Sequence, residues 1–153
     1  MAKRRNISSG LALFIAGLAL VTSFWQGFEE RRHNRYSVRP ILNIEESMID
    51  TIRTFKLVNN GLGPAIIDEF KVIAGDSSWD SEAVNPWNEL VGYKGLRPKV
   101  KWMWYYGKDG TVKMDERTDI FAFKADSVYH LDAEVVIKYR SIYDEKMTLR
   151  RSF

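Results

Sequence analysis

The sequence contains no cysteine, only two histidines and only four prolines among its 153 residues. The lack of cysteine excludes disulfide bonds, thiolate zinc sites, iron–sulfur clusters and cysteine nucleophiles. Glycine is also sparse, at ten residues, whereas 45 % of the residues are apolar and 28 % are charged. This composition excludes a disordered tail and a collagen-like repeat, and it leaves room for one globular domain with a short appendage.

The formal net charge of +3 is concentrated near the N-terminus. Of the 23 basic and 20 acidic residues, six basic and two acidic ones precede Tyr36, so residues 36–153 hold 17 basic and 18 acidic residues. The positive excess therefore flanks one uncharged segment and does not belong to the remainder of the chain. This location argues against nucleic acid as a partner, because phosphate binding needs a basic surface on the folded domain.

The uncharged segment runs from Ile7 to Trp25. As a helix it would be about 28 Å long, close to the roughly 30 Å hydrocarbon core of a bilayer. We therefore predict a basic tail over residues 1–6, a transmembrane helix over 7–27, a charged juxtamembrane segment over 28–35 and a domain over 36–153. The lipid bilayer is then a partner of this chain, and the juxtamembrane arginines can meet anionic headgroups.

Two other interpretations of this segment stay open. It has the layout of a signal peptide, with a weak small-residue cleavage site at Val21–Ser23, and it could also be a buried core helix. Arginines and lysines on both flanks leave the orientation nearly balanced. Since a short basic N-terminus usually stays in the cytoplasm, we expect a single-pass protein of the bacterial inner membrane with an extracytoplasmic domain.

Small side chains interrupt the apolar segment at four positions: Gly10, Ala12, Ala16 and Gly17. Small residues spaced by about one turn allow two membrane helices to approach closely. This spacing predicts self-association of the chain through its membrane helix.

Beyond Pro40 the hydrophobic pattern has a period of two, which indicates strands. We predict strands over residues 40–45, 51–59, 65–74, 98–106, 111–115, 119–124, 132–140 and 145–151, and a loop over 75–78. One short helix is predicted over 85–91, because Asn85 is a good N-cap and Pro86 suits the first helical position. Short strands separated by frequent turns predict a mainly β fold, an immunoglobulin-like antiparallel β-sandwich.

One turn signal is dense and lies between two predicted strands: Asn59, Asn60, Gly61, Gly63 and Pro64. We predict an antiparallel hairpin across it, with the glycines supplying positive φ angles and the asparagines bonding to the turn backbone. A second hairpin is predicted across residues 108–110, with residues 111–115 pairing back on the preceding strand.

Three segments together resemble a recurrent group of proteins: RHNRYSVRP at residues 32–40, NNGLGPA at 59–65 and YRSIYDE at 139–145. The group consists of small, largely uncharacterised bacterial single-pass membrane proteins with an N-terminal helix and a β-sandwich domain. Its members often carry glycine at the position of Asp144. The resemblance implies a fold and a membrane location, and it implies no activity and no catalytic residues.

Catalytic and metal-binding patterns are absent from the sequence. His33 lies among the juxtamembrane arginines and His130 lies about a hundred residues away, so they do not form a spaced ligand motif. The serines have no nucleophile elbow, and the glycines at residues 61 and 63 belong to no phosphate-binding loop. We therefore expect a protein that is not an enzyme and that has no cofactor and no metal.

One constellation, Lys94–Lys108, combines five basic residues, no acidic residue and a run of aromatics. Its candidate contact residues for a ligand or a partner are Lys99, Lys101, Trp102, Trp104 and Tyr105. Aromatic faces interleaved with cations suit stacked anionic ligands, anionic bilayers or protein grooves. The competing interpretation is a central strand with Val100, Trp102 and Trp104 in the core and with Lys99, Lys101 and Met103 outside.

Two hypotheses for the function follow. The first is a membrane-anchored, non-enzymatic β-sandwich module that binds a protein or an envelope component through loops or a strand edge. The second is a cytoplasm-facing sensor that binds an anionic small ligand of the cyclic-nucleotide type near residues 99–105 and signals through its membrane helix.

Overall fold

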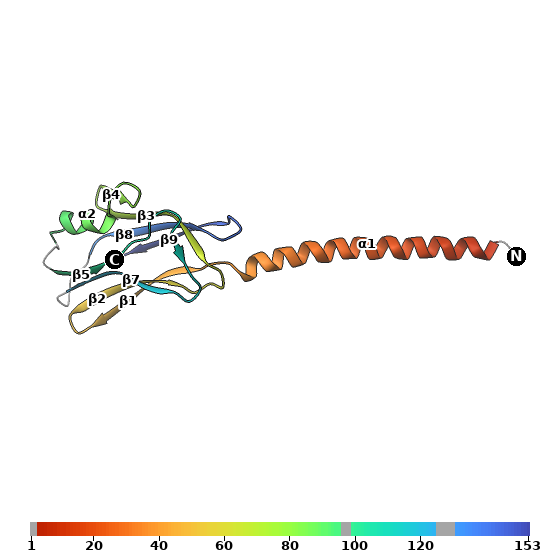
Figure 1. Cartoon of the computed structure of the whole chain (residues 1–153), viewed down its shortest axis with the longest axis horizontal. Coiled ribbons are helices and arrows are strands. Elements are labelled where there is room, and N and C mark those ends of the chain that lie inside the picture. Colours follow the sequence, from red (N-terminus) through yellow and green to blue (C-terminus); the bar gives the residue numbers. More distant parts are fainter. Residues whose placement is uncertain (1–2, 96–98, 125–130) are drawn as a thin grey trace. The chain divides into compact units, whose positions relative to one another are not determined.

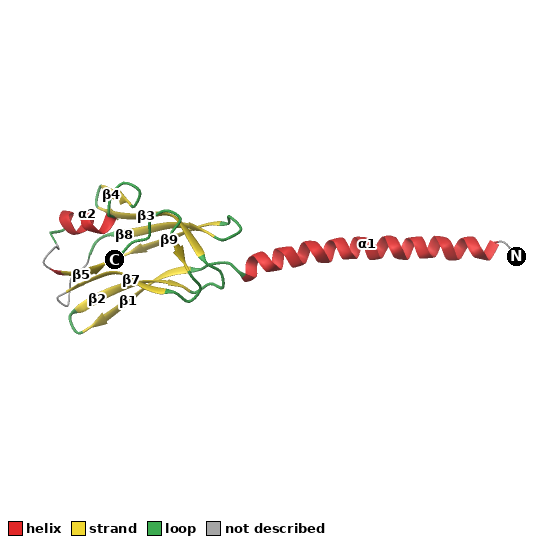
Figure 2. Ribbon diagram, in the orientation of Figure 1, coloured by secondary structure: helices red, strands yellow, loops and turns green. Residues whose placement is uncertain are grey.

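The computed structural model describes residues 3–95, 99–124 and 131–153, with side chains from residue 10 onward. The chain divides into two compact units, residues 1–37 and residues 38–153. The first unit is α1 (Lys3–Ser37), the long uninterrupted helix in Figures 1 and 2. The predicted apolar and charged segments therefore belong to one helix.

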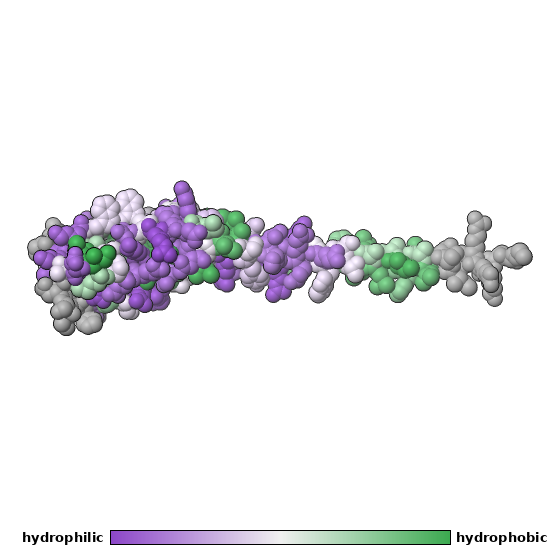
Figure 3. All heavy atoms as spheres, turned by 90° about the horizontal axis from the view of Figure 1, so that it is seen from below, coloured by the Kyte–Doolittle hydropathy of each residue, from purple (hydrophilic) through white to green (hydrophobic). Residues whose placement is uncertain are grey.

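The part of α1 from Gly10 to Ser37 is long and apolar enough to cross a membrane, with a mean hydropathy of 1.7 in its most apolar stretch. None of that stretch is buried within the protein. In the structure this helix is therefore not part of a buried core, whereas a signal peptide would match the same length and composition. Figure 3 shows the apolar residues of α1 followed by a hydrophilic segment along the same helix.

The second unit consists of two antiparallel sheets and a short helix, which confirms the predicted mainly β sandwich. Its strands are β1 (Leu42–Ile49), β2 (Ile52–Asn59), β3 (Ala65–Ala74), β4 (Ser77–Asp80), β5 (Val100–Met103), β6 (Thr111–Val112), β7 (Arg117–Lys124), β8 (Glu134–Arg140) and β9 (Lys146–Ser152). One sheet has the order β1-β2-β7-β5, and the other has the order β4-β3-β8-β9 with β6 paired to β3. We call them sheet A and sheet B.

The predicted hairpin between residues 51–59 and 65–74 is wrong. β2 lies in sheet A and β3 lies in sheet B, whereas β2 forms its hairpin with β1 through the two-residue turn Asp50–Thr51. The physical reason is the core: Phe55 of β2 and Phe70 of β3 are both fully buried, and strands in facing sheets bury both apolar faces at once. The β2–β3 turn therefore crosses from one sheet to the other.

Several local predictions also change in the structure. A loop was expected over residues 75–78, but residues 77–80 form β4, and β6 pairs with β3 and not with the strand before it. Gly61 and Gly63 are not among the residues with positive φ. The strands predicted over 132–140 and 145–151 correspond to β8 and β9, which pair as a hairpin; Asp144 in its turn has a φ of +59°, in the left-handed region that glycine favours.

The helix α2 (Pro86–Tyr93) closes the domain at one side, and the predicted cap is confirmed: the Asn85 side chain accepts hydrogen bonds from the amides of Trp87 and Asn88. Trp87 is fully buried between the sheets, where its ring stacks on Phe121 at a centroid distance of 4.7 Å. The Trp87 indole N–H donates to the carbonyl oxygen of Trp104 at 2.7 Å. The core therefore fixes the backbone of the segment that follows β5.

Candidate functional site

A β-bulge in β5 decides which aromatic residues reach the surface. Val100 pairs with Phe123 and Trp102 pairs with Ala122, so the register shifts at Lys101. As a result Val100 and Met103 both pack against the core. Trp102 and Trp104 point outward, with 55 % and 51 % of their surface exposed. The interpretation that placed both tryptophans in the core and Met103 outside is therefore wrong, because a bulge reverses the alternation of side chains.

Hydrogen bonds hold both exposed tryptophans in place. The Trp102 indole N–H donates to the carbonyl oxygen of Asp119 at 3.1 Å, and Ala122 opposite Trp102 is almost fully buried. The backbone N–H of Trp104 donates to the carbonyl oxygen of Ile120 at 2.9 Å. The Trp102 side chain is therefore fixed on the outer side of the strand, and Trp104, just beyond β5, is fixed through its backbone.

The remaining residues of the predicted constellation separate into different environments. The Tyr105 ring lies 6.5 Å from the Phe70 ring and packs against the core, so it does not belong to the exposed group. Lys101 is exposed and Lys99 is half-buried, while Arg97 lies outside the described residues. The structure thus brings Lys101, Trp102 and Trp104 together at the surface.

The β1–β2 hairpin adds apolar residues that the sequence analysis did not single out. Ile49 and Ile52 pair directly beside the turn and are 70 % and 39 % exposed. The strand register places them on the outer face of sheet A, the face that also carries Trp102. We call Ile49, Ile52, Trp102 and Trp104 the distal patch. The sequence signal that could have pointed to Ile49 and Ile52 was the two-residue turn that follows the alternating residues of β1.

Figure 3 shows apolar residues gathered over the β1–β2 hairpin end of the domain, within a largely hydrophilic surface. The other half of the same sheet face is charged. There Glu45 pairs with Arg117 at 3.3 Å, and Asp119 pairs with Lys56 at 3.7 Å. The outer face of sheet A is therefore divided into an ion-paired half and an apolar half.

Two lysines border the distal patch without an acidic partner. Lys101 is next to Trp102 in the chain, and Lys124 pairs with Ile52 across the strands. Within the described ranges neither ammonium group lies in ion-pair distance of a carboxylate. Lys101 and Lys124 therefore give the border of the distal patch a positive charge.

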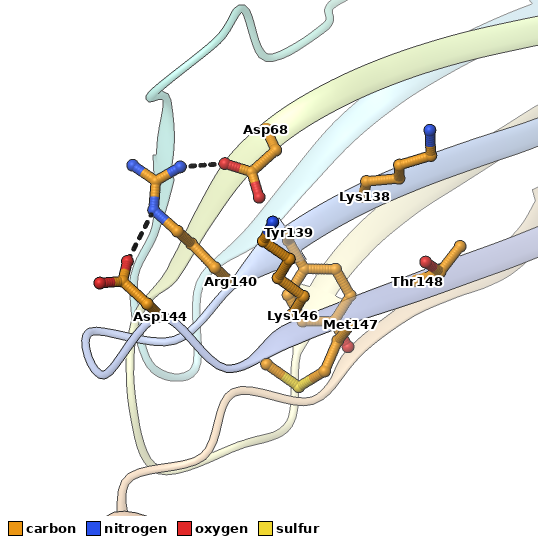
Figure 4. Close-up of a pocket in the computed structure, with 8 residues that line it drawn as sticks. All are labelled: Asp68, Lys138, Tyr139, Arg140, Asp144, Lys146, Met147 and Thr148. Carbon is orange, nitrogen blue, oxygen red and sulfur yellow. Dashed lines mark hydrogen bonds and ion pairs between the residues drawn. The ribbon is translucent and has the colours of Figure 1, made fainter.

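Sheet B carries a shallow pocket beside the β8–β9 turn, drawn in Figure 4. Arg140 forms ion pairs there with Asp68, with Asp109 at 2.8 Å and with Asp144 at 3.5 Å. Glu69 on the neighbouring strand forms ion pairs with Lys138 and Lys71. Because these charges are already partnered, the pocket has the character of a structural ion-pair network.

The predicted turn residues lie at the end of the domain opposite the distal patch. Asn59 is fully buried, and its side-chain oxygen accepts hydrogen bonds from the amides of Ile41 and Gly61. Asn60 is exposed, and Pro64 is half-buried directly before β3. The Asn59 side chain therefore holds the backbone of this turn together.

The four small residues of α1 do not share one face. At 3.6 residues per turn, Gly10 and Gly17 lie on one side of the helix, and Ala12 and Ala16 lie roughly 100° or more away. All four are exposed, and a Cβ placed on either glycine would meet nothing within 4 Å. The predicted contact face therefore consists of two narrow stripes.

No metal site is formed by the part of the chain that the structure describes, because no group of three or more histidine or carboxylate residues comes together there. His33 is exposed on α1, and His130 lies outside the described residues. In comparisons with known proteins, no protein-family model matches the chain, and no curated protein matches it. The resemblance to a group of bacterial membrane proteins therefore stays a prediction.

Proposed function

We propose that this chain is a membrane-anchored, non-enzymatic β-sandwich module that binds a protein partner of the cell envelope through the distal patch. The observation that carries the proposal is the pair of positioned, half-exposed tryptophans on the same sheet face as two exposed isoleucines. Large apolar side chains gathered on one face of a domain mark interaction sites.

The composition of the patch supports a protein partner. Interface centres are enriched in aromatic residues and depleted in charge, and a polar rim surrounds them. The distal patch has this arrangement, because the ion pairs of Glu45 and Asp119 border its apolar residues. The indole of Trp102 is already fixed by its hydrogen bond to Asp119, so binding would cost little side-chain entropy.

The anchor in this proposal is α1, which crosses the bacterial inner membrane once and leaves the domain outside the cytoplasm. Its support is the length and hydropathy of the helix together with the basic residues that precede it in the sequence. The immunoglobulin-like character of the sandwich is part of the same proposal.

Position-specific crosslinking in living cells tests the function. A photoreactive amino acid replaces Trp104 or Ile49 in the full chain, and a control places it at Thr148, which is exposed on sheet B. We expect one discrete crosslinked protein from both patch positions and none from Thr148. Identical products from all three positions, or none from the patch, would contradict the proposal.

The side of the membrane is tested independently. Since the chain has no cysteine, a Thr51→Cys variant carries a single thiol in an exposed turn. A membrane-impermeant maleimide added to intact spheroplasts should label it. Labelling only after the membrane is opened would place the domain in the cytoplasm.

A second candidate function is the binding of an anionic small ligand, and the observation that favours it is Lys101 beside Trp102, since Lys101 forms no ion pair within the part of the chain that the structure describes. A thermal-shift panel of cyclic nucleotides against the full chain in detergent tests it. A shift that Lys101→Glu abolishes would support the ligand, and the absence of any shift would remove it.

A further inference from the structure

Four residues, Val38–Ile41, lie between α1 and β1 in the sequence and belong to the folded domain; we call them the strap. The strap packs backbone against backbone on the β2–β3 turn. A Cβ on Gly61 would overlap the carbonyl oxygen of Arg39, and a Cβ on Gly63 would overlap the carbonyl oxygen of Val38. Close approach, and not positive φ, is therefore the reason for glycine at both positions.

The side chain of Asn59 connects the strap to this turn. Its oxygen accepts from the amide of Ile41 at 3.1 Å and from the amide of Gly61 at 3.0 Å. Its nitrogen donates to the carbonyl oxygens of Gly63, at 2.8 Å, and Val112, at 3.2 Å. One fully buried amide thus satisfies four backbone groups from three segments.

Sheet B also contacts the strap and the residue that follows it. The amide of Leu42 donates to the hydroxyl oxygen of Tyr139 at 3.4 Å, and Arg39 forms an ion pair with Glu145 at 3.4 Å. The carbonyl oxygen of Ile41 accepts from the amide of Asn60 at 2.8 Å. The strap is therefore attached to both sheets of the sandwich.

β1 is the direct continuation of the strap and ends at the distal patch. It pairs with β2 over eight consecutive residues, from Leu42 opposite Asn59 to Ile49 opposite Ile52, without a register shift. Antiparallel hydrogen bonds run perpendicular to the strands. The turn Asp50–Thr51 joins the distal ends of β1 and β2, so a pull on the strap is passed on to β7 through the ladder between β2 and β7.

We propose that the domain is built to carry tension between the membrane and a bound partner. The inference rests on the proposed function, in which α1 is the anchor and the partner sits on the distal patch. A pull through the strap then acts on β1, and a pull at Trp102 acts on β5, so the load crosses the ladders that join β1 to β2, β2 to β7 and β7 to β5. The strands must slide past each other to separate, so the hydrogen bonds share the load and do not break one by one.

Single-molecule pulling on the full chain in detergent micelles tests the proposal. The absence of native cysteine allows two thiol handles to be placed uniquely. The shear geometry uses Tyr36→Cys with Lys124→Cys at the far end of β7, and the peeling geometry uses Tyr36→Cys with Leu62→Cys; all three positions are exposed. Because shear loads the bonds together, we expect its unfolding force to be at least about twofold higher than that of peeling.

Equal forces, or a lower force in shear, would overturn the proposal. Should the Lys124 variant fail to fold, Trp102→Cys offers a second exposed handle on β5, and it must show the same dependence on direction. No partner is present during pulling, so a negative result would leave the docking proposal standing. Failed crosslinking at the patch would in turn leave the measured force ratio unchanged.

Discussion

The two ends of the sandwich differ in how their side chains are used, although β1 and β2 extend to both ends. At the end that holds the strap, the buried Asn59 amide bonds to four backbone groups, and two glycines allow the backbone segments to approach closely. At the other end, the distal patch exposes tryptophan and isoleucine beside two lysines that form no ion pair with any residue the structure describes. Both ends lie on β1 and β2, so the hairpin itself does not cause the difference.

This contrast separates residues that maintain the fold from residues that are available for binding. A buried polar group without a partner costs free energy, so the strap end tolerates little change. An exposed apolar side chain adds little to the free energy of folding, and its presence needs another reason. Substitutions at the two ends should therefore differ in what they damage.

The largest effect is expected for Gly63→Ala. The new methyl group would overlap the carbonyl oxygen of Val38, and neither backbone segment can move without breaking other contacts. We expect a loss of about 3–5 kcal/mol in the free energy of unfolding, measured by urea titration of tryptophan fluorescence. Gly92→Ala is the matched control, because a Cβ there meets nothing within 4 Å and should not destabilise the protein. A loss below about 1 kcal/mol for Gly63→Ala would show that the strap is not tightly packed.

Asn59→Ala should be the next most damaging change. It leaves four buried backbone groups without their partner, at an expected cost of about 2–4 kcal/mol. Hydrogen exchange should also accelerate at the amides of Ile41 and Gly61. Asn60→Ala, at an exposed side chain, is the control and should stay within about 0.5 kcal/mol of the wild type. Equal losses from both variants would contradict the role assigned to Asn59.

The contribution of the ion-paired Glu69 to stability can be tested by varying the pH. Hydrogen bonds from Lys138 and then Lys71 lower the pKa of Glu69 to about 2. A lowered pKa in the folded state means that this carboxylate stabilises the protein above pH 4.5, and that the contribution is lost as the pH falls toward 2. The stability advantage of the wild type over Glu69→Gln should shrink across that window. Asp76→Asn, at an exposed loop carboxylate, is the comparison, and a constant advantage of the wild type over Glu69→Gln would contradict the assignment.

The smallest effect on stability is expected at the distal patch. Ile49→Thr keeps a β-branched residue in an exposed strand position and should change the free energy of unfolding by no more than about 0.5 kcal/mol. It should nevertheless weaken crosslinking from position 104. Ile44→Thr, five residues earlier on the buried face of the same strand, should cost about 2 kcal/mol or more. Equal losses from both would mean that the patch belongs to the core.

Local signals were sufficient for some elements. The capped helix α2 and the β8–β9 hairpin follow from Asn85 and Pro86 and from alternating residues around one turn. The strands that pair with β2 could not be predicted from such local signals, because alternation identifies a strand without identifying its neighbour. The turn that contains Gly61 and Gly63 looked like a hairpin turn, although it passes between sheets.

The candidate site was only partly predictable for a related reason. The aromatic and basic segment was visible in the sequence, but strict alternation assigned Trp102 and Trp104 to the core. The bulge at Lys101 moved both to the surface, and Ile49 and Ile52 joined them only through the register of three strand pairs.

The sequence by itself determined the apolar helix near the N-terminus, the period-two pattern of a β domain and the absence of cysteine chemistry. These properties depend on composition and on short-range spacing, which the chain carries wherever it folds. Only the tertiary structure decided which strands pair, why Gly61 and Gly63 face the strap, and which aromatic residues meet solvent. Those outcomes depend on contacts between residues far apart in the chain, where packing and register outweigh local preference.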